Sequence, residues 1–495
     1  MKKTRKENDQ GNYKKIAKSQ EGITLVALVI TIIIIIILAT VTINMAFGNN
    51  GLITQAQLAK DMASNSTTAE GEDMNRLMQE YANVMAEDSE INPPDVTPPT
   101  DGTFSEDKGV NSPNIGPNME LVVFDDNTDT WVPDETKDGY SYVDTSTEGA
   151  NTSEWANAKV TIDGIDSYFV WIPRYAYKIN GENDIDIKFL QGTGNLAADG
   201  VTTCKYADDP TLNTSTDYII HPVFTANADL GGGFGNNNGT NDNGIEGIWI
   251  GKYEASLANK ADGTNIVLST SDSTDGDILL SENPDKTIVT KPGYSSWRNC
   301  TIGKMYTNAL AYSKDLESHM LKNSDWGAVA YLTESKYGRN GNEIGMNTNS
   351  SYITGGGANN AYATTNQNQS TTGNVYGIYD MRGGATERVA GYYNGSTSSD
   401  LTNNGGSFAS NGGPSTKYAT AYTGTSASTA YKYGDATYET SGWHSDDASF
   451  VNSDYPFFHR GGYYDHLASI TGVFYYSNSK GGAYTYDSFR VSLVV

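Results

Sequence analysis

One stretch near the N-terminus restricts the architecture of the whole chain. Between Ile23 and Ile43 the only polar side chains are four threonines, and six consecutive isoleucines run from Ile32 to Ile37. This length is sufficient for a helix to cross a bilayer core of about 30 Å. Because backbone groups find no water partners in lipid, we expect a helix despite the β-branched residues. The basic residues before it orient the N-terminus to the cytoplasm, which predicts a single-pass protein of the cell membrane with its C-terminal part extracellular.

The boundary between the basic leader and the apolar run carries a second signal. Glu21 and Gly22 are followed directly by Ile23-Thr24-Leu25-Val26, and this arrangement resembles the type IV prepilin signal. The resemblance implies that a prepilin peptidase cleaves after Gly22 and methylates the new N-terminus, Ile23. Major pilins have Glu at the fifth residue after the cut, where this chain has Ala27, so the resemblance implies cleavage more directly than assembly with other pilin subunits. The alternatives are an uncleaved signal anchor and, with a poorer fit because of the long apolar run, a secretory signal peptide.

Changes in composition divide the chain into segments. Gly48-Asn49-Asn50-Gly51 interrupts the first helix, and apolar residues then recur at helical spacing between Met74 and Met85. Residues 91–118 are rich in Pro, Asp, Gly and Ser, which predicts an extended spacer. The expected segments are a basic leader (1–22), a transmembrane pilin-like helix (23–47), a stalk helix (48–90), the spacer (91–118) and an outer domain (119–495).

Short aromatic and β-branched runs characterise the outer domain. Examples are residues 121–124, 168–172 and 248–250, whereas residues 305–320 and 325–335 have helical patterns. The 52 glycines and 33 tyrosines of the chain also suit short strands joined by polar loops. We therefore expect an α+β fold with short strands, few helices and long loops.

Five segments of the outer domain carry a resemblance to a known family. They are, in order, Tyr168-Phe169-Val170-Trp171-Ile172-Pro173, Ile248-Trp249-Ile250-Gly251-Lys252-Tyr253-Glu254, Asn374-Val375-Tyr376-Gly377-Ile378-Tyr379-Asp380-Met381, Arg460-Gly461-Gly462 and Ser488-Phe489-Arg490-Val491. In this order they resemble the formylglycine-generating-enzyme-like branch of the C-type lectin fold. The family usually continues the third segment with Ser-Gly-Asn-Val-Trp-Glu-Trp. This chain has Arg-Gly-Gly-Ala-Thr-Glu-Arg there, so only the turn and Glu387 match.

The residues that would carry catalysis in that family have no counterparts in this chain. Oxidising members hold copper with a cysteine pair near the C-terminus, but residues 443–495 contain no cysteine. Cys204 and Cys300 lie upstream of that region and form either a disulfide or two free, buried thiols. The five histidines form no short-spaced ligand pair, and no Gly-x-Ser-x-Gly or phosphate loop occurs. We expect a protein that is not an enzyme and has no catalytic metal.

Structural calcium is the one cofactor that the sequence leaves open. The segment from Ser271 to Gly276, with Glu282, places Gly and Glu at the sixth and twelfth positions of an EF-hand loop. The first position is Ser rather than Asp and the flanks are not helical, which favours an acidic surface loop.

The charge of the chain bears on its partners. The net charge is −26, and residues 1–22 carry seven Lys or Arg against three acids, so the rest of the chain carries −30. An acidic exterior of this kind repels phosphate backbones. We therefore expect no nucleic-acid partner.

Tyrosine is concentrated in residues 458–495, which we call the C-terminal strip. Six tyrosines fall between residues 463 and 486, among Ser, Asn, Asp and Gly. This is the chemistry of antibody paratopes, because tyrosine buries a large area at low entropy cost and offers a hydroxyl. Tyrosines half-packed on a sheet are the alternative, but adjacent Tyr-Tyr pairs occur twice. The residues expected to contact a ligand are Tyr463, Tyr464, Asp465, His466, Tyr475, Tyr476, Asn478, Tyr484 and Tyr486.

The framework of the C-terminal strip has a further resemblance. Arg460-Gly461-Gly462, Gly472-Val473-Phe474 and the segment 488–491 are similar to variable proteins diversified by retroelements, which use the same lectin-like fold. In those proteins the variable codons start as AAC or AAT and mutate at adenines. Such codons reach Tyr, Asp, His, Ser, Asn, Leu and Ile, but not Lys480. The resemblance implies that the strip varies between copies of the gene.

These observations together predict an adhesin-like protein. A pilin-type anchor would present a non-catalytic lectin-like domain on the surface or a pilus of a Gram-positive cell, where the C-terminal strip recognises an extracellular protein or glycan. Two alternatives are an extracellular enzyme with altered metal chemistry on the same fold and a structural minor pilin or pseudopilin.

Overall fold

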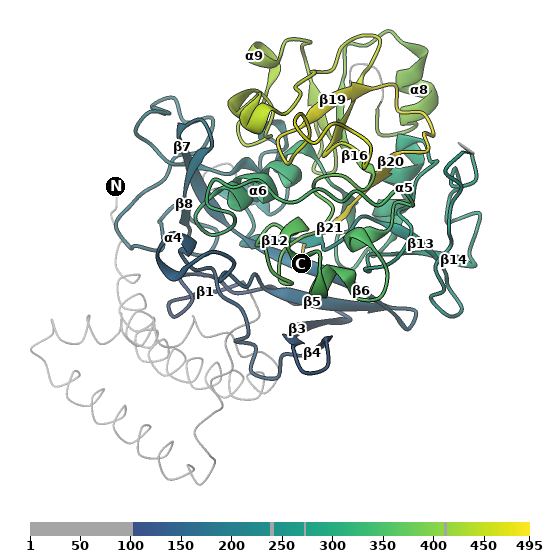
Figure 1. Cartoon of the computed structure of the whole chain (residues 1–495). Helices are drawn as coiled ribbons and strands as arrows, with labels where there is room; N and C mark the ends of the chain where they lie inside the picture. Colours follow the sequence, from purple (N-terminus) through teal and green to yellow (C-terminus); the bar gives the residue numbers. More distant parts are fainter. Residues whose placement is uncertain (1–101, 238–241, 272–273, 410–412) are drawn as a thin grey trace, which may run out of the picture. The chain divides into compact units, whose positions relative to one another are not determined.

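The computed structural model describes residues 102–237, 242–271, 274–409 and 413–495. The predicted leader, transmembrane helix and stalk helix, with Gly22 and Ile23, lie outside these residues. The described part is a mixed α+β structure, rich in strands and with few helices (Figure 1). No helix within the described ranges is long and apolar enough to cross a membrane.

A seven-stranded antiparallel sheet forms the base of the domain. Its two central strands consist of β-branched and aromatic residues and are buried over most of their length, with Trp171 directly opposite Trp249. Strands of this composition suit a sheet that is covered on both faces. In spatial order the sheet contains β15 (His319–Met320), β21 (Val491–Leu493), β12 (Gly247–Gly251), β6 (Ile165–Pro173), β5 (Asn157–Ile162), β3 (Met119–Asp125) and β4 (Thr130–Pro133).

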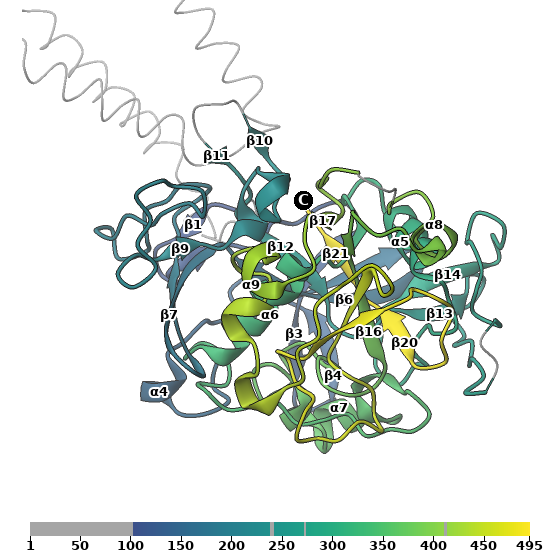
Figure 2. The same cartoon turned by 90° about the horizontal axis from the view of Figure 1, so that it is seen from above.

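A second sheet contains three strands that lie wholly or largely in the C-terminal strip. In spatial order it consists of β17 (Thr420–Tyr422), β16 (Thr386–Tyr393), β18 (Phe457–Arg460) and β19 (Tyr476–Ser479), and β20 (Asp487–Phe489) pairs with β16 in parallel. Only Arg490 separates β20 from β21, so the chain passes from the second sheet into the first through this one residue. Figure 2 shows β16 and β20 side by side near the end of β21.

Smaller sheets complete the strand content. They are β1 (Phe104–Ser105) with β2 (Val110–Asn111), β8 (Asp184–Phe189) with β7 (Tyr175–Gly181) and β9 (Ile219–Ile220), β10 (Asn236–Asn237) with β11 (Asp242–Asn243), and β13 (Ser256–Asn259) with β14 (Lys286–Val289).

Two helices longer than two turns lie beside the sheets. Helix α6 (Asn323–Glu334) is buried along its whole length and contacts β16 and β8, which confirms the helix predicted at 325–335. The helix predicted at 305–320 is wrong in its C-terminal part, because α5 (Ile302–Ala311) ends early and residues 319–320 form β15. The Ser318 hydroxyl donates to the Ala309 carbonyl and accepts from the Ser313 N–H, which closes the chain into a turn.

The other helices are short. They are α4 (Thr145–Glu148), α7 (Ala361–Thr364), α8 (Ser399–Gly405) and α9 (Ala427–Ala430), with 3-10 turns η2 (Pro222–Phe224), η3 (Ala228–Leu230), η4 (Thr354–Gly356), η5 (Gln367–Gln369), η6 (Tyr438–Thr440) and η7 (Trp443–Ser445).

The predicted spacer is too long at its C-terminal end. Among the described residues of this predicted spacer, Val110 and Asn111 are fully buried. The Asn111 amide donates to the carbonyls of Gly192 and Glu246 at 2.9 and 3.0 Å. The described residues before 119 therefore belong to the domain, because their side chains pack in its core and donate hydrogen bonds to its backbone carbonyls.

Candidate binding site

Three of the five family-like segments meet at a buried ion pair. Arg490, the joint between the two sheets, pairs with Glu387 of β16 through Nε at 3.0 Å and Nη2 at 2.5 Å. Its Nη1 and Nη2 also donate to the carbonyls of Gly251 and Tyr379 at 2.8 and 2.9 Å. One side chain thus joins the ends of three separate segments of the chain.

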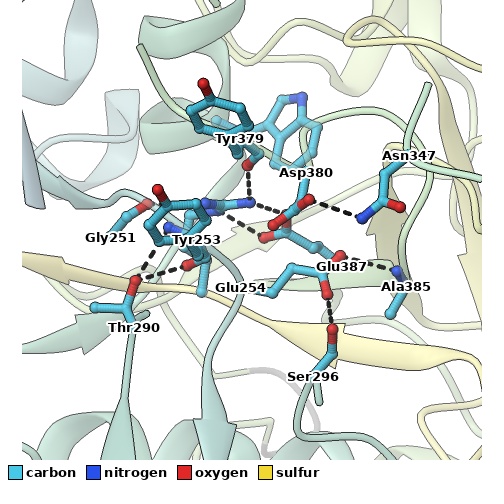
Figure 3. A network of polar contacts seen from close by, with 12 residues as sticks. Gly251, Tyr253, Glu254, Thr290, Ser296, Asn347, Tyr379, Asp380, Ala385 and Glu387 are labelled. Carbon is cyan, nitrogen blue, oxygen red and sulfur yellow. Dashed lines mark hydrogen bonds and ion pairs between the residues drawn. The ribbon is translucent and has the colours of Figure 1, made fainter. Parts of the chain in front are cut away.

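Two further carboxyl groups surround this pair, as Figure 3 shows. Glu254 accepts from the Ala385 N–H at 2.8 Å and from the Ser296 hydroxyl, and Asp380 accepts from the Asn347 amide at 2.8 Å. Burial, with the nearby Asp380 and Glu387 carboxylates, raises the pKa of Glu254 well above its ordinary value. All three acids and Arg490 are almost completely buried. The network therefore has no access to a substrate in this structure and serves to lock the two sheets together.

A glycine turn connects the buried network to the C-terminal strip. Gly383 and Gly384 both have positive φ (74° and 67°), and a Cβ on Gly384 would lie 2.7 Å from Oε1 of Glu254. The Gly384 carbonyl accepts a hydrogen bond from the Tyr464 N–H at 3.0 Å. The turn thus fixes the start of the tyrosine-rich loop against the core.

Five tyrosines of the domain form a continuous row of rings, which we call the aromatic ladder. Tyr484 and Tyr486 are stacked with centroids 5.5 Å apart and planes 9° apart, and Tyr486 stacks on Tyr463 at 5.3 Å and 26°. Tyr463 then contacts Tyr464 edge to face at 5.8 Å, and Tyr464 contacts Tyr352 in the same way at 5.0 Å. The structure therefore brings together four of the predicted ligand contacts from two separate loops.

A histidine branch extends from the ladder. The His466 ring lies 4.1 Å from the Tyr463 ring and 5.7 Å from that of Tyr475, which in turn lies 6.2 Å from His459. Burial lowers the pKa of His466. Tyr475 is only 5% exposed, so little of its side chain is available to a ligand in this structure, and its ring packs against both histidines.

Two buried arginines, Arg388 and Arg298, contact the rings at the two ends of the ladder. The Arg388 guanidinium lies 5.4 Å from the Tyr484 ring centroid and pairs with Asp487 at 2.5 Å. The Arg298 guanidinium lies 4.1 Å from the Tyr352 ring centroid and donates to the Thr485 carbonyl at 2.6 Å. Burial alone would raise the pKa of Asp487, but Arg388 and the nearby His459 keep this pKa below its ordinary value. The end rings of the ladder therefore pack against charged side chains that are themselves buried and fixed by hydrogen bonds.

Two of the predicted contacts point away from the ladder. Tyr476 is 1% exposed, and its ring packs against the Arg460 guanidinium at 5.6 Å. Asn478 lies on the same face of β19, and its amide donates to the Phe450 carbonyl at 2.9 Å. Side chains two residues apart on a strand share a face. Tyr476 is therefore a core residue, and Asn478 is engaged by the backbone on that side of the strand.

An exposed loop adjoins the ladder. Leu467 is 69% exposed, and Asp465 and Ala468 beside it are also exposed. Arg382 donates to the Ala468 carbonyl at 2.5 Å and so holds the loop near its tip. The ladder and this loop form one candidate binding surface that combines tyrosine hydroxyls, a leucine and an acid.

Sequence reasoning missed Tyr352, Arg298 and Arg388. Arg388 had a signal, because it follows Glu387 in the segment that resembles the family. Tyr352 and Arg298 lie far upstream of the C-terminal strip, and nothing in their local sequence connects them to it.

The cysteines and the calcium candidate have structural roles. Cys204 and Cys300 are free and buried in separate hydrophobic clusters, so the disulfide alternative is wrong. Burial raises the pKa of Cys204 to about 12 and that of Cys300 further. In the EF-hand-like segment Asp275 accepts from the Ser269 N–H at 2.6 Å and from the Asn299 amide. Across the described part of the chain, no group of three or more His, Cys, Asp or Glu side chains is arranged to hold a metal ion.

A scan against protein-family models gives no match to this chain, and a search of curated proteins finds no similar sequence. The arrangement of the side chains therefore carries the functional argument.

Proposed function

We propose that this chain is a surface-displayed, non-catalytic binding protein, in which the aromatic ladder and the adjoining loop recognise an extracellular partner. The observation that carries the proposal is the row of stacked tyrosines on two buried arginines. Rings held in this way lose little conformational entropy on binding, which is why rigid tyrosines dominate paratopes.

The proposal includes a lectin-like fold and a prepilin-type anchor. Three of the five family-like segments meet at Arg490, although they are widely separated in the sequence, which supports a common structural role for these three. The anchor rests on the apolar run and on Gly22 and Ile23. Mass analysis of the mature N-terminus tests it. An N-methylated Ile23 is expected, and an intact leader would contradict processing by a prepilin peptidase.

A protein partner fits the surface better than a glycan. Sugars bind aromatic side chains by laying their C–H face on an open ring face. In the ladder the ring faces of Tyr484, Tyr486 and Tyr463 are stacked on one another, so the rings offer mainly edges and hydroxyls. The exposed Leu467 adds an apolar anchor of the kind that fills pockets on protein surfaces.

Binding of the full-length protein in lipid nanodiscs to intact cells tests this function. Tyr463→Ala and Tyr486→Ala should each weaken binding by about tenfold or more, the loss expected for a central interface residue. Tyr438→Ala and Tyr455→Ala are matched controls, because these tyrosines are 46% and 42% exposed outside the ladder.

Treatment of the target cells separates the two kinds of partner. Protease should abolish binding, whereas periodate oxidation of surface glycans should leave it unchanged. Ladder variants that bind as tightly as the unmodified protein would refute the proposed site. Binding that survives protease but not periodate would instead make the partner a glycan.

A further inference from the structure

A polar cavity lies beside the turn that follows α6, and none of the ladder residues lines it. Its volume is about 400 Å³, within the range of roughly 300–1,000 Å³ that small-molecule sites occupy. The side chains that matter for its chemistry are those of Thr145, Asn151, Arg339, Asn340, Asn342 and Glu343.

The turn that forms one wall of the cavity is rigid. The Arg339 N–H donates to the Thr333 carbonyl at 2.5 Å, and the Gly341 N–H donates to the Glu334 carbonyl at 2.8 Å. The Asn342 amide donates to the Arg339 carbonyl at 2.9 Å. These bonds tie the turn to the end of a fully buried helix, so the wall is formed before any ligand arrives.

Arg339 is a cation in this wall with neutral hydrogen-bond partners. Its Nη2 donates to the Asn368 side-chain oxygen at 2.6 Å, and its Nη1 donates to that of Asn151 at 3.4 Å. No carboxylate of the described residues forms an ion pair with it. Burial lowers its pKa, but a guanidinium keeps its charge at any physiological pH.

Glu343 lines the same cavity but is engaged elsewhere. Its Oε2 pairs with Arg382 Nη1 at 2.9 Å. Burial, only partly offset by Arg382, raises its pKa to about 7. Arg339 thus remains the positive centre of the cavity, while the nearby Glu343 disfavours a ligand with two negative charges.

We propose that this cavity is a second binding site, which takes a small carboxylate that carries hydroxyl groups, such as a hexuronic acid. The Arg339 fork matches a carboxylate in a bidentate geometry. The amides of Asn151 and Asn340 and the amide oxygen of Asn342 offer donors and acceptors to hydroxyl groups. The site is independent of the function proposed for the ladder.

An adjoining cavity bears on the source of the ligand. It has a volume of about 290 Å³ and shares Asn340 with the first, and Asp184 and Asp186 are among its lining residues. Its lining contains three acids against the single cation Lys336, which disfavours a second negatively charged sugar unit in this place. The carboxylate is therefore either a free hydroxy acid or a uronic acid at the end of a glycan whose next unit is neutral.

Saturation-transfer NMR on the full-length protein in nanodiscs tests the site, with galacturonate as the probe. Galactose, which lacks the carboxylate, and acetate, which lacks the hydroxyls, should each bind at least tenfold more weakly than galacturonate. Arg339→Gln should weaken galacturonate by at least tenfold, and Arg339→Lys, which keeps the charge but loses the fork, by less. Lys137→Gln is the matched control, because it removes a cation from the lining of a different cavity of about 360 Å³.

The outcomes are distinct as long as each variant keeps its unfolding midpoint. Equal binding of galactose and galacturonate, or Arg339→Gln with unchanged affinity, would overturn the proposal. An equal loss in Lys137→Gln would show a general charge effect and would overturn it too. A uronic acid linked to a neutral sugar that binds more tightly than the monomer assigns the ligand to glycan ends, and equal affinity assigns it to the free acid.

Discussion

Replacement of Arg490 by Met should destabilise the domain strongly, because Glu387 would keep a buried charge without a partner. The two side chains are paired at 2.5 and 3.0 Å, and both are almost fully buried. Asp380 and Glu254 lie in the same network, where burial raises the pKa of each carboxyl, and neither offers a compensating positive charge. Once the guanidinium is gone, Glu387 can avoid the cost of a buried charge only by binding a proton.

The cost of that proton sets the magnitude. An unfolded Glu titrates at about 4.3, and each pH unit above this value costs about 1.4 kcal/mol for a carboxyl that must stay protonated when folded. The penalty is therefore about 3.7 kcal/mol at pH 7 and about 1 kcal/mol at pH 5. The carbonyls of Gly251 and Tyr379 also lose their donor, which adds roughly 1 kcal/mol each at any pH. The sum, about 6 kcal/mol at pH 7, is comparable to the whole stability of many domains.

Urea unfolding followed by tryptophan fluorescence measures this effect on the full-length chain. All seven tryptophans lie between residues 131 and 443, so the signal reports on the domain alone. The double variant Arg490→Met/Glu387→Leu is the control. Because it removes both charges, it should be more stable than Arg490→Met at pH 7 by about 2 kcal/mol or more. A deficit in Arg490→Met that is the same at pH 5 and pH 7, or a double variant as unstable as the single, would refute the reasoning.

Three further outcomes follow from buried groups of the domain. Burial raises the pKa of Glu439 from 4.5 to about 8, so the stability that its bound proton contributes is fully present below about pH 4.5 and is lost as the pH rises through 8. The melting temperature of Glu439→Gln, measured relative to that of the unmodified protein, should therefore be higher at pH 9 than at pH 5. A difference between the two proteins that does not change with pH would contradict this. Cys204 and Cys300 should react with a thiol reagent only as fast as the domain unfolds; fast labelling of the folded protein would show that a thiol is accessible. Gly384→Ala should cost about 1–3 kcal/mol in urea unfolding, since Ala at this φ is strained and its Cβ meets Glu254, and an unchanged midpoint would count against the turn geometry.

The sequence was most informative where secondary structure depends on local composition. The runs at 121–124, 168–172 and 248–250 became β3, β6 and β12, because a continuous β-branched and aromatic run suits a strand buried on both faces. The end of α5 depends instead on Ser318, and its hydroxyl contacts are made only after the chain has turned. The spacer was drawn too long because the partners of Asn111 lie far along the chain, in segments that composition alone does not connect to it.

For the candidate site, the abundance of tyrosine was a better guide than the position of each one. Four of the ladder residues were identified from the sequence, and they come from two loops in which they are partly exposed. Tyr476 was misassigned because the face of a strand residue depends on where the strand starts and on its register. The Tyr475 ring contacts the rings of His459 and His466, and its side chain is buried. The anchors Arg298 and Tyr352 depend on tertiary contacts alone.

The buried charged residues that stabilise the fold are different from the tyrosines that form the ladder. The chain from Gly384 to Arg388 contributes to both, since the turn supports Tyr464 while Glu387 pairs with Arg490 and Arg388 supports Tyr484. The buried partners are charged and make specific geometric pairs, so few substitutions preserve them. The rings above them contact mainly one another, and each ring can change without breaking an ion pair below. A fold built in this way can accept different side chains at the ladder on one base, which is consistent with the binding function proposed for it.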